Sequence, residues 1–307
     1  MDVQGSRQVK VTDVTLRDGL QNESRMLSTE VKLEIARAIV AAGITSMEIG
    51  SFVREDLVPQ MADTTDVVTH LRAWPGLEAI GLIPNLQGAR TAVAAGASHI
   101  RMVISASEGH SQSNTRRTVE QGLLEAERIF QWVAEQDRPI SMGISVATAF
   151  VCPFDGVTTA DQLRRVVAHL YRSGYRKIIL ADTIGQATPK QVERSVGQLA
   201  DRFSNVEWGL HTHNTYDYGI ANVWAAWSQG VRWFDGAVGG IGGCPFAPGA
   251  AGNSATEDIV GLFETSGIFT GISLEGLGRA AMELSKALGH RLDSATSRIR
   301  GWNAAIA

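Results

Sequence analysis

Two histidines separated by a single residue, His211 and His213, are the first candidates for chemistry in this chain of 307 residues. Side chains two positions apart on a β-strand share a face, so both imidazoles can reach one metal ion at a strand end. An H-x-H pair can equally be two hydrogen-bonded polar residues without a metal. Asp18 supplies a third ligand if its segment meets theirs, and we then expect metal binding.

The side-chain carbonyl of Asn253 is a candidate fourth ligand. Two neutral imidazoles, a carboxylate and an amide oxygen form a mixed nitrogen and oxygen set. Such a set suits a divalent ion, Mg²⁺ or Mn²⁺, rather than a thiolate-rich structural zinc. The sequence therefore predicts a divalent metal site whose ligands are Asp18, His211, His213 and Asn253.

Three further charged residues lie near expected strand ends, and each has two interpretations. Arg17 forms a salt bridge with Asp18 at the rim of the fold, or it presents a fixed cation to a developing enolate oxygen. Glu48 is a buried acid oriented by Arg17, or a structural partner only. Asp182 caps a helix, or it supports the metal ligands.

Cys244 lies in a glycine-rich segment, residues 239–253. A cysteine is usually a small core residue, but so many glycines indicate a loop that moves or closely approaches another group. We therefore predict an accessible thiol that takes part in proton transfer. Two thiols in a chain of this length do not make a disulfide framework, so each is judged by its own segment, and Cys152 is expected to be structural.

Bringing these residues together requires strands that end on one face of a sheet. Short apolar, β-branched runs alternate with longer segments of helical spacing, which is typical of βα units. The runs predict strands over 8–14, 45–49, 78–83, 99–105, 140–146, 177–181, 207–210 and 233–237. Helices are predicted over 29–42, 56–71, 86–95, 119–135, 160–173, 189–202, 218–229 and 256–266, several of them followed by glycine.

Eight βα units without a linker predict one α/β domain over residues 1–307, a (β/α)₈ TIM barrel with extra C-terminal helices. The barrel covers about residues 8–270 and the helical extension about 273–307, with a helix over 274–288 and a loosely ordered tail over 299–307. A Rossmann-type sheet is disfavoured because no G-x-G-x-x-G follows the first strand. In such barrels the reactive groups lie at the carboxyl ends of the strands.

The composition excludes several classes of protein. Hydrophobic residues make up 44% and charged residues 20%, as in a globular protein rather than a disordered one. The net charge is -4 and no run of like charge occurs, so we expect no nucleic-acid partner. No stretch approaches the roughly 18 consecutive apolar residues of a membrane span, and the first ten residues lack an apolar segment. We therefore expect a cytoplasmic protein without a membrane partner.

Several motifs resemble the hydroxymethylglutaryl-CoA lyase family, part of a metal-dependent TIM-barrel metallolyase superfamily. They are R-D-G-L-Q-N-E at 17–23, S-F-V at 51–53, V-P-Q-M-A-D at 58–63, P-N-L at 84–86, D-T-I-G at 182–185, G-G-C-P-F-A-P-G-A-A-G-N at 242–253 and T-E-D at 256–258. The resemblance covers about residues 11–271. Synthases of the superfamily share R-D-G and H-x-H, whereas the G-G-C-P loop and the L-Q-N-E extension are characteristic of the lyases.

The resemblance implies a carbon–carbon lyase that cleaves a 3-hydroxy-3-methylglutaryl-CoA-like thioester to acetyl-CoA and acetoacetate, the reverse of a Claisen-type condensation. It implies metal ligation by Asp18, His211, His213 and Asn253, with Arg17 on the thioester enolate. Glu48 then gives acid/base support, Cys244 lies in a mobile catalytic loop, and His211 or Cys244 carries the protons. A homodimer is also implied.

The sequence departs from the lyase pattern at Asn214, at Gly50 and in the segment 13–19. We expect these positions to flank the substrate and to affect which acyl group is accepted. A related lyase acting on another 3-hydroxyacyl-CoA, such as citramalyl-CoA, is therefore an alternative. Two further alternatives are a synthase that condenses an acyl-CoA with a keto acid, and an inactive barrel. A metal analysis and a cleavage assay separate these cases.

Overall fold

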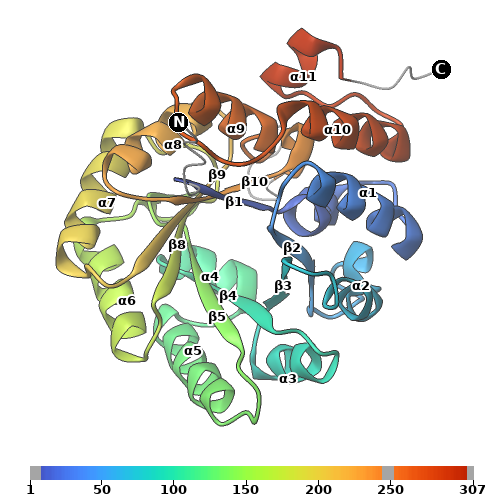
Figure 1. Cartoon of the computed structure of the whole chain (residues 1–307). Coiled ribbons are helices and arrows are strands. Elements are labelled where there is room, and N and C mark those ends of the chain that lie inside the picture. Colours follow the sequence, from blue (N-terminus) through green and yellow to red (C-terminus); the bar gives the residue numbers. More distant parts are fainter. Residues whose placement is uncertain (1–7, 244–251, 303–307) are drawn as a thin grey trace, which may run out of the picture.

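A computed structural model describes residues 8–243 and 252–302. Within these ranges eight parallel strands close into a barrel in the order β1-β10-β9-β8-β5-β4-β3-β2 (Figure 1). This confirms the predicted (β/α)₈ TIM barrel. The barrel strands are β1 (Lys10–Asp13), β2 (Ser46–Ser51), β3 (Glu78–Ile83), β4 (His99–Ser105), β5 (Ser141–Ala147), β8 (Lys177–Asp182), β9 (Glu207–Thr212) and β10 (Trp233–Gly236).

Helices surround the barrel, and their first turns explain why they begin where they do. Thr118, Thr159 and Thr188 each form a capping box with a glutamine three residues later, which satisfies backbone N–H groups that lack helical partners. The helices are α1 (Thr29–Ala41), α2 (Thr64–Leu71), α3 (Leu86–Ala94), α4 (Glu108–Thr115), α5 (Val119–Ala134), α6 (Ala160–Arg172), α7 (Pro189–Arg202), α8 (Gly219–Ser228) and α9 (Thr256–Thr265).

Short elements fill the connections at the carboxyl ends of the strands. They are the π-helix η1 (Thr15–Gly19), the 3-10 turns η2 (Leu20–Asn22), η3 (Pro59–Met61) and η4 (Val238–Gly240), and the hairpin of β6 (Val151–Cys152) with β7 (Gly156–Val157). The prediction of a single helix over 56–71 is wrong, because Pro59 begins a separate 3-10 turn and α2 begins only at Thr64. Helix α4 was not predicted.

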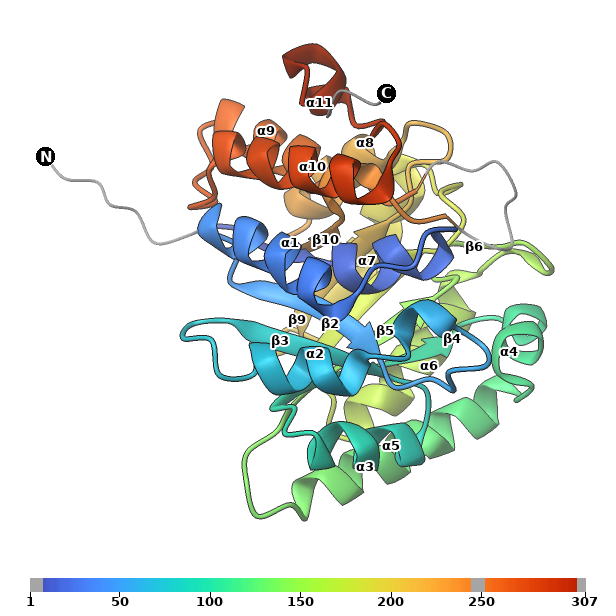
Figure 2. The same ribbon diagram turned by 90° about the vertical axis from the view of Figure 1, so that its right-hand side faces the viewer.

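Two helices follow the barrel, as predicted: α10 (Leu274–Leu288) and α11 (Ala295–Arg300). Helix α10 packs on both α1 and α9 (Figure 2). Trp302 is 9% exposed and packs against Gly278. The prediction of a loosely ordered tail is therefore wrong for residues 299–302, and residues 303–307 lie outside the described residues.

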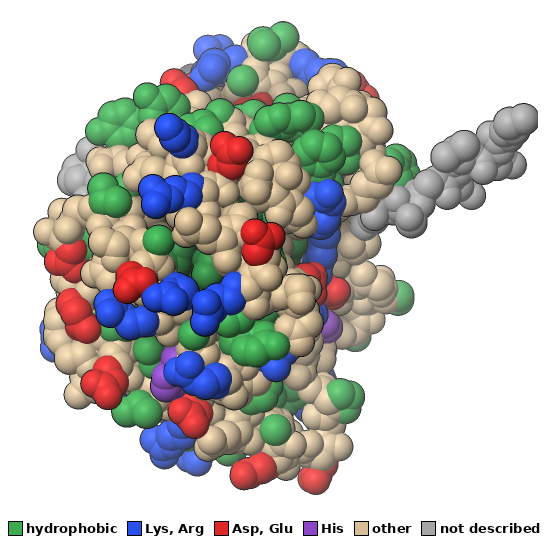
Figure 3. Space-filling view, turned by 90° about the vertical axis from the view of Figure 1, so that its left-hand side faces the viewer, with side chains coloured by type: hydrophobic (Ala, Val, Ile, Leu, Met, Phe, Trp, Pro, Cys, Tyr) green, Lys and Arg blue, Asp and Glu red, His purple; other side chains and the backbone are tan. Residues whose placement is uncertain are grey.

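Apolar side chains fill the layer between the strands and the helices, whereas the barrel interior also holds buried charged side chains, among them Arg101 and Asp235. On the outer face shown in Figure 3, basic and acidic side chains are interspersed among polar and apolar ones. Across residues 8–243 and 252–302, no helix has the length and apolar character needed to cross a membrane.

Candidate active site

The segment directly after β1 turns Arg17 and Asp18 into the barrel mouth. The Asp13 carboxylate accepts a hydrogen bond from the Thr15 backbone N–H at 3.0 Å and so holds the start of η1. Every residue of η1 is buried. A β-carbon at position 19 would lie 2.8 Å from the Ile241 side chain, so Gly19 allows the two segments to approach this closely.

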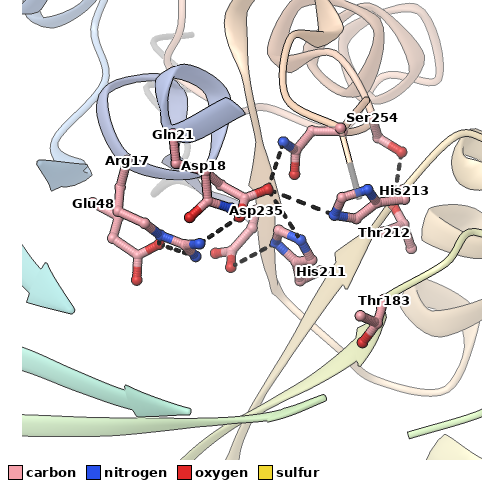
Figure 4. A network of polar contacts seen from close by, with 12 residues as sticks. Arg17, Asp18, Gln21, Glu48, Thr183, His211, Thr212, His213, Asp235 and Ser254 are labelled. Atoms are coloured by element: carbon pink, nitrogen blue, oxygen red, sulfur yellow. Dashed lines mark hydrogen bonds and ion pairs between the residues drawn. The ribbon is translucent and has the colours of Figure 1, made fainter. Parts of the chain in front are cut away.

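Asp18, His211 and His213 lie together, as the sequence predicted. One ligand atom from each residue lies within 4.8 Å of the other two. Asp18 Oδ2 is 3.5 Å from His213 Nε2 and 3.9 Å from His211 Nε2. His211 lies in β9 and His213 directly follows it, so their spacing places both rings on the side of Asp18 (Figure 4).

Asn253 joins this group from the segment before α9. Its Nδ2 donates to Asp18 Oδ2 at 2.8 Å and to the Ile241 carbonyl at 2.9 Å. Its Oδ1 is buried and accepts no hydrogen bond from the described residues. Buried carbonyl oxygens rarely lack a partner, and a bound cation would provide one. The three nearby ligand atoms and this oxygen fit the mixed set expected for a divalent ion.

The pKa shifts of Asp18 and His213 favour the protonation states of metal ligands. Burial alone would raise the pKa of Asp18, but Arg17 and the two histidines hold this pKa well below its usual range. Burial lowers the pKa of His213. Burial opposes the charge of His211 as well, yet its hydrogen bond to Asp235 and the nearby Asp18 raise the pKa of that imidazole. An ionised Asp18 and a neutral His213 are the forms that bind a metal.

Arg17 is fixed by two carboxylates. Its Nε donates to Glu48 Oε2 at 2.6 Å, its Nη2 lies 2.5 Å from the same oxygen, and its Nη1 donates to Asp18 Oδ1. Glu48 is completely buried. The salt bridge of the first interpretation is present and fixes the Arg17 cation beside Asp18, and the role of Arg17 toward an enolate oxygen stays a prediction.

Two buried charged residues were missed by the sequence analysis. Asp235 lies in β10 with its Oδ2 3.4 Å from His211 Nδ1. Arg101 lies in β4 and donates to Asp235 Oδ2 at 2.6 Å. Both residues lie in runs that were correctly predicted as strands. The only sequence signal for either one is a charged side chain inside a mostly apolar run.

A cavity of about 420 Å³ opens at the carboxyl ends of the barrel strands. The charged group forms one wall, and apolar and uncharged polar residues form the others. Such a mixture of apolar walls and a few convergent polar groups is typical of a small-molecule site. The other walls include Ser51, Val53, Leu57, Val58, Leu82, Ile83, Pro84, Val103, His110, Asn114, Thr115, Ser145, Ala147, Ala181 and Thr183.

Two other candidates, Asp182 and Cys152, do not line the described cavity. Cys244 lies outside the described residues, although the preceding Gly243 lines the cavity. Asp182 accepts the backbone N–H groups of Gln186 and Ala187, as a cap of that turn does. Burial raises the pKa of Asp182 to about 6. Cys152 is buried and its sulfur accepts two backbone N–H groups of its own hairpin, as a structural residue does.

Two positions that depart from the lyase pattern do not line the described cavity. A side chain at Gly50 would meet Thr64 of α2, 2.6 Å from its Oγ1, so this position faces the helix layer. Asn214 accepts the Gly219 N–H at 3.0 Å and holds the loop before α8. Both positions support the elements around the site, and the expectation that they flank the substrate stays a prediction.

Comparisons with known proteins agree with this geometry. The family model described as HMGL-like matches residues 8–283. The chain is 42% identical to the (R)-citramalyl-CoA lyase of Chloroflexus aurantiacus, over 92% of each chain. It is 36% identical to the mitochondrial hydroxymethylglutaryl-CoA lyase of Homo sapiens, over 94% of this chain and 88% of the relative.

A solved structure of an HMG-CoA lyase from Acinetobacter baumannii in complex with coenzyme A and 3-methylmalate is also similar. Its TM-score is 0.89, with 38% identity and 94% of each chain covered. The chain thus belongs to the HMGL-like family, the hydroxymethylglutaryl-CoA lyases and their relatives, and it is a carbon–carbon lyase.

Proposed function

We propose that this protein is a metal-dependent lyase that cleaves a 3-hydroxyacyl-CoA with a terminal carboxylate, first of all 3-hydroxy-3-methylglutaryl-CoA to acetyl-CoA and acetoacetate. The observation that carries the proposal is the convergence of Asp18, His211 and His213 beside the fixed cation of Arg17 in one cavity. A metal held by the three ligands can bind the hydroxy acid, and the Arg17 guanidinium can bind the enolate oxygen. The similarity to lyases named for CoA thioesters supports this substrate class.

Asp18, His211, His213 and Asn253 would hold Mg²⁺ or Mn²⁺. When bound, such an ion supplies positive charge that acidifies a chelated hydroxyl group. The chain's own contribution is the orientation of its ligands. Gln21 and Arg17 both donate to Asp18 Oδ1, which leaves Oδ2 directed at the histidines.

Arg17 would stabilise the acetyl-CoA enolate that forms when the carbon–carbon bond breaks. A guanidinium fixed by Glu48 does not need to reorganise as the negative charge develops. We assign Glu48 to holding Arg17 in place, because one of its carboxylate oxygens already accepts Arg17 and the other faces Arg101.

Of the two candidates for proton transfer, we favour Cys244. His211 directs Nδ1 at Asp235 and Nε2 at Asp18, so neither nitrogen of a metal-bound ring remains for substrate. Cys244→Ser should therefore bind Mn²⁺ normally and lose most cleavage activity, since a hydroxyl is a far weaker acid than a thiol. The buried Cys152 is the matched control, and Cys152→Ser should remain active.

Citramalyl-CoA is the second candidate substrate, favoured by the 42% identity to a relative named for it. Its carboxylate is attached directly to the carbinol carbon, one methylene closer than in 3-hydroxy-3-methylglutaryl-CoA. A pocket discriminates one methylene by only about 10- to 200-fold, so both thioesters must be assayed. Acetoacetate identifies cleavage of the first, and pyruvate identifies cleavage of the second.

The deciding experiment combines these assays with metal removal. We expect excess chelator to abolish acetyl-CoA release and Mg²⁺ or Mn²⁺ to restore it. Full activity in chelator would contradict the metal site, and condensation of acetyl-CoA with a keto acid without cleavage would favour a synthase. A cytoplasmic homodimer without nucleic-acid or membrane partners stays a prediction, and light scattering on the purified protein measures its mass.

A further inference from the structure

An arginine lies in the middle of barrel strand β4, where apolar residues usually fill the interior. Arg101 is only 1% exposed. In the closed order of the barrel, β4 lies directly across from β10, four strands away in either direction. The Arg101 side chain therefore crosses the barrel interior to reach Asp235. A buried guanidinium is costly unless it is paired, so its partners indicate its role.

Arg101 contacts two carboxylates from different strands. It makes two contacts with Asp235, Nη1 to Oδ2 at 2.6 Å and Nη2 to Oδ1 at 3.4 Å. Its Nη1 also lies 3.7 Å from Glu48 Oε1. The ring of Trp233 lies 5.1 Å from the guanidinium and provides an apolar surface for it.

Each of these carboxylates holds a residue of the proposed site. Asp235 Oδ2 faces His211 Nδ1 at 3.4 Å, which favours the tautomer with the proton on Nδ1 and leaves Nε2 free for a metal. The second oxygen of Glu48 accepts Arg17. Figure 4 shows Arg17 paired with Glu48, and Asp235 paired with His211.

The contacts close a ring in which acidic and basic side chains alternate. It runs from Asp18 through Arg17, Glu48, Arg101 and Asp235 to His211, which faces Asp18 again. Arg101 and Glu48 are the members of this ring that do not line the described cavity. On one side of the site, Asp18 connects His211 to Arg17 directly. On the other side, Arg101 makes this connection through Asp235 and Glu48.

We propose that Arg101 is a positioning residue that holds His211 through Asp235 and Arg17 through Glu48. The inference rests on the proposed function, because it assigns His211 to a metal and Arg17 to substrate. A planar guanidinium reaches two carboxylates at once, whereas a lysine ammonium offers a single point charge. Lysine at this position should therefore restore the pairing only in part.

The test compares Arg101→Met, Arg101→Lys and Asp235→Asn with the parent protein. Mn²⁺ affinity of the metal-free protein is measured by calorimetry, followed by kcat and KM for the thioester that the parent cleaves. We expect Arg101→Met and Asp235→Asn to weaken Mn²⁺ binding by roughly 10- to 100-fold, as loss of a residue that orients a ligand does. The kcat should fall more than KM rises, and Arg101→Lys should lie between parent and Arg101→Met.

Arg138→Met is the matched control, because Arg138 is partly buried and donates at 2.9 and 2.8 Å to the backbone carbonyls of Val93 and Ala97, which lie in and beyond α3. It should lower the melting temperature without changing Mn²⁺ affinity. The double variant Arg101→Met/Asp235→Asn should lose no more affinity than the weaker-binding single variant, since both remove one shared contact.

Mn²⁺ affinity and kcat within twofold of the parent in Arg101→Met would overturn the inference and leave the proposed function intact. Fully additive losses in the double variant would also overturn it, because Arg101 would then not act through Asp235. If Arg101→Met does not fold, Asp235→Asn and Arg101→Lys decide by the same measurements. Failure of the parent itself to bind Mn²⁺ would overturn the metal site and this inference together.

Discussion

Arg17 illustrates how one side chain combines charge with a fixed direction. Three of its nitrogens contact Glu48 and Asp18, so its position is set before substrate arrives. We expect Arg17→Lys to lower kcat on the order of 100- to 1,000-fold, because lysine cannot reproduce the fork that presents charge to the enolate. KM should change only a few-fold, since the enolate charge appears mainly in the transition state. Steady-state release of acetyl-CoA measures both constants.

Arg164, an exposed arginine of α6 that pairs with Asp161, provides the comparison. Arg164→Ala should leave both constants unchanged, because an exposed ion pair contributes little. A raised KM with an unchanged kcat in Arg17→Lys would instead assign Arg17 to substrate binding.

At this scale the sequence predicts residues at or just after the expected strand ends and misses two charged residues further inside their strands, Arg101 and Asp235. Asp18 and His213 could be found because position after an apolar run indicates the reactive face of a barrel. Arg101 and Asp235 could not be paired, because their contact crosses between opposite strands far apart in the chain. Only the closed strand order makes them neighbours.

Among the elements, the turn after η4 determines how closely η1 and the segment of Asn253 approach. Gly242 has a φ of +96°, and a side chain there would lie 2.6 Å from Asn253 Nδ2 and 2.7 Å from the Asp18 carbonyl. We expect Gly242→Ala to weaken Mn²⁺ binding at least 10-fold, because it must displace a proposed ligand. Calorimetry on the metal-free protein gives the affinity.

Gly76 separates backbone strain from this displacement. It has a φ of +74°, and a side chain there would meet nothing within 4 Å. Gly76→Ala should therefore cost stability of about 1 kcal/mol from the left-handed backbone and leave Mn²⁺ affinity unchanged. Equal losses of affinity in both variants would mean that strain, not contact with Asn253, is responsible.

Elements with a regular apolar period were predictable, and those without one were not. Helix α7 was predicted with its observed bounds, 189–202, because its apolar residues recur at helical spacing. Helix α4 has the sequence EGHSQSNT, which has no apolar face. Tertiary contacts hold it instead, among them His110 with Ser105 at 2.7 Å and the Gly109 N–H with Asp155.

For the molecule as a whole, one buried carboxyl links the barrel to the outer helices. Asp13 of β1 accepts a hydrogen bond from Thr256 of α9 at 2.7 Å. Burial raises the pKa of Asp13 to about 6, partly offset by hydrogen bonds from Thr256 and Thr15. A group with a raised pKa binds protons more tightly when folded. Its contribution to the free energy of unfolding is present below the unfolded pKa of 3.8 and is lost as pH rises through about 6.

Asp13→Asn removes this titration, and its amide oxygen can accept the Thr15 N–H while its Nδ2 donates to the Thr256 hydroxyl oxygen. Relative to the parent, the variant should therefore gain stability between pH 4 and pH 7, on the order of 3 kcal/mol or less. Urea unfolding of both proteins at the two pH values measures the difference. A stability difference that does not change with pH would mean that Asp13 does not titrate differently in the folded protein.

Metal binding should stabilise the whole fold, because its proposed ligands come from segments far apart in the chain. Asp18 follows β1, His211 lies in β9 with His213 directly after it, and Asn253 precedes α9, so the unfolded chain cannot present the same set. A ligand that binds only the folded state adds about 2.7 kcal/mol at 100 times its Kd. Saturating Mn²⁺ should thus raise the melting temperature by several degrees over that measured in chelator.

His213→Ala should fold but lose this rise in melting temperature. His169→Ala is the control, because His169 is a histidine of α6 that pairs with Glu127, and this variant should keep the rise. An equal rise in the parent and in His213→Ala would place the bound Mn²⁺ at a different site.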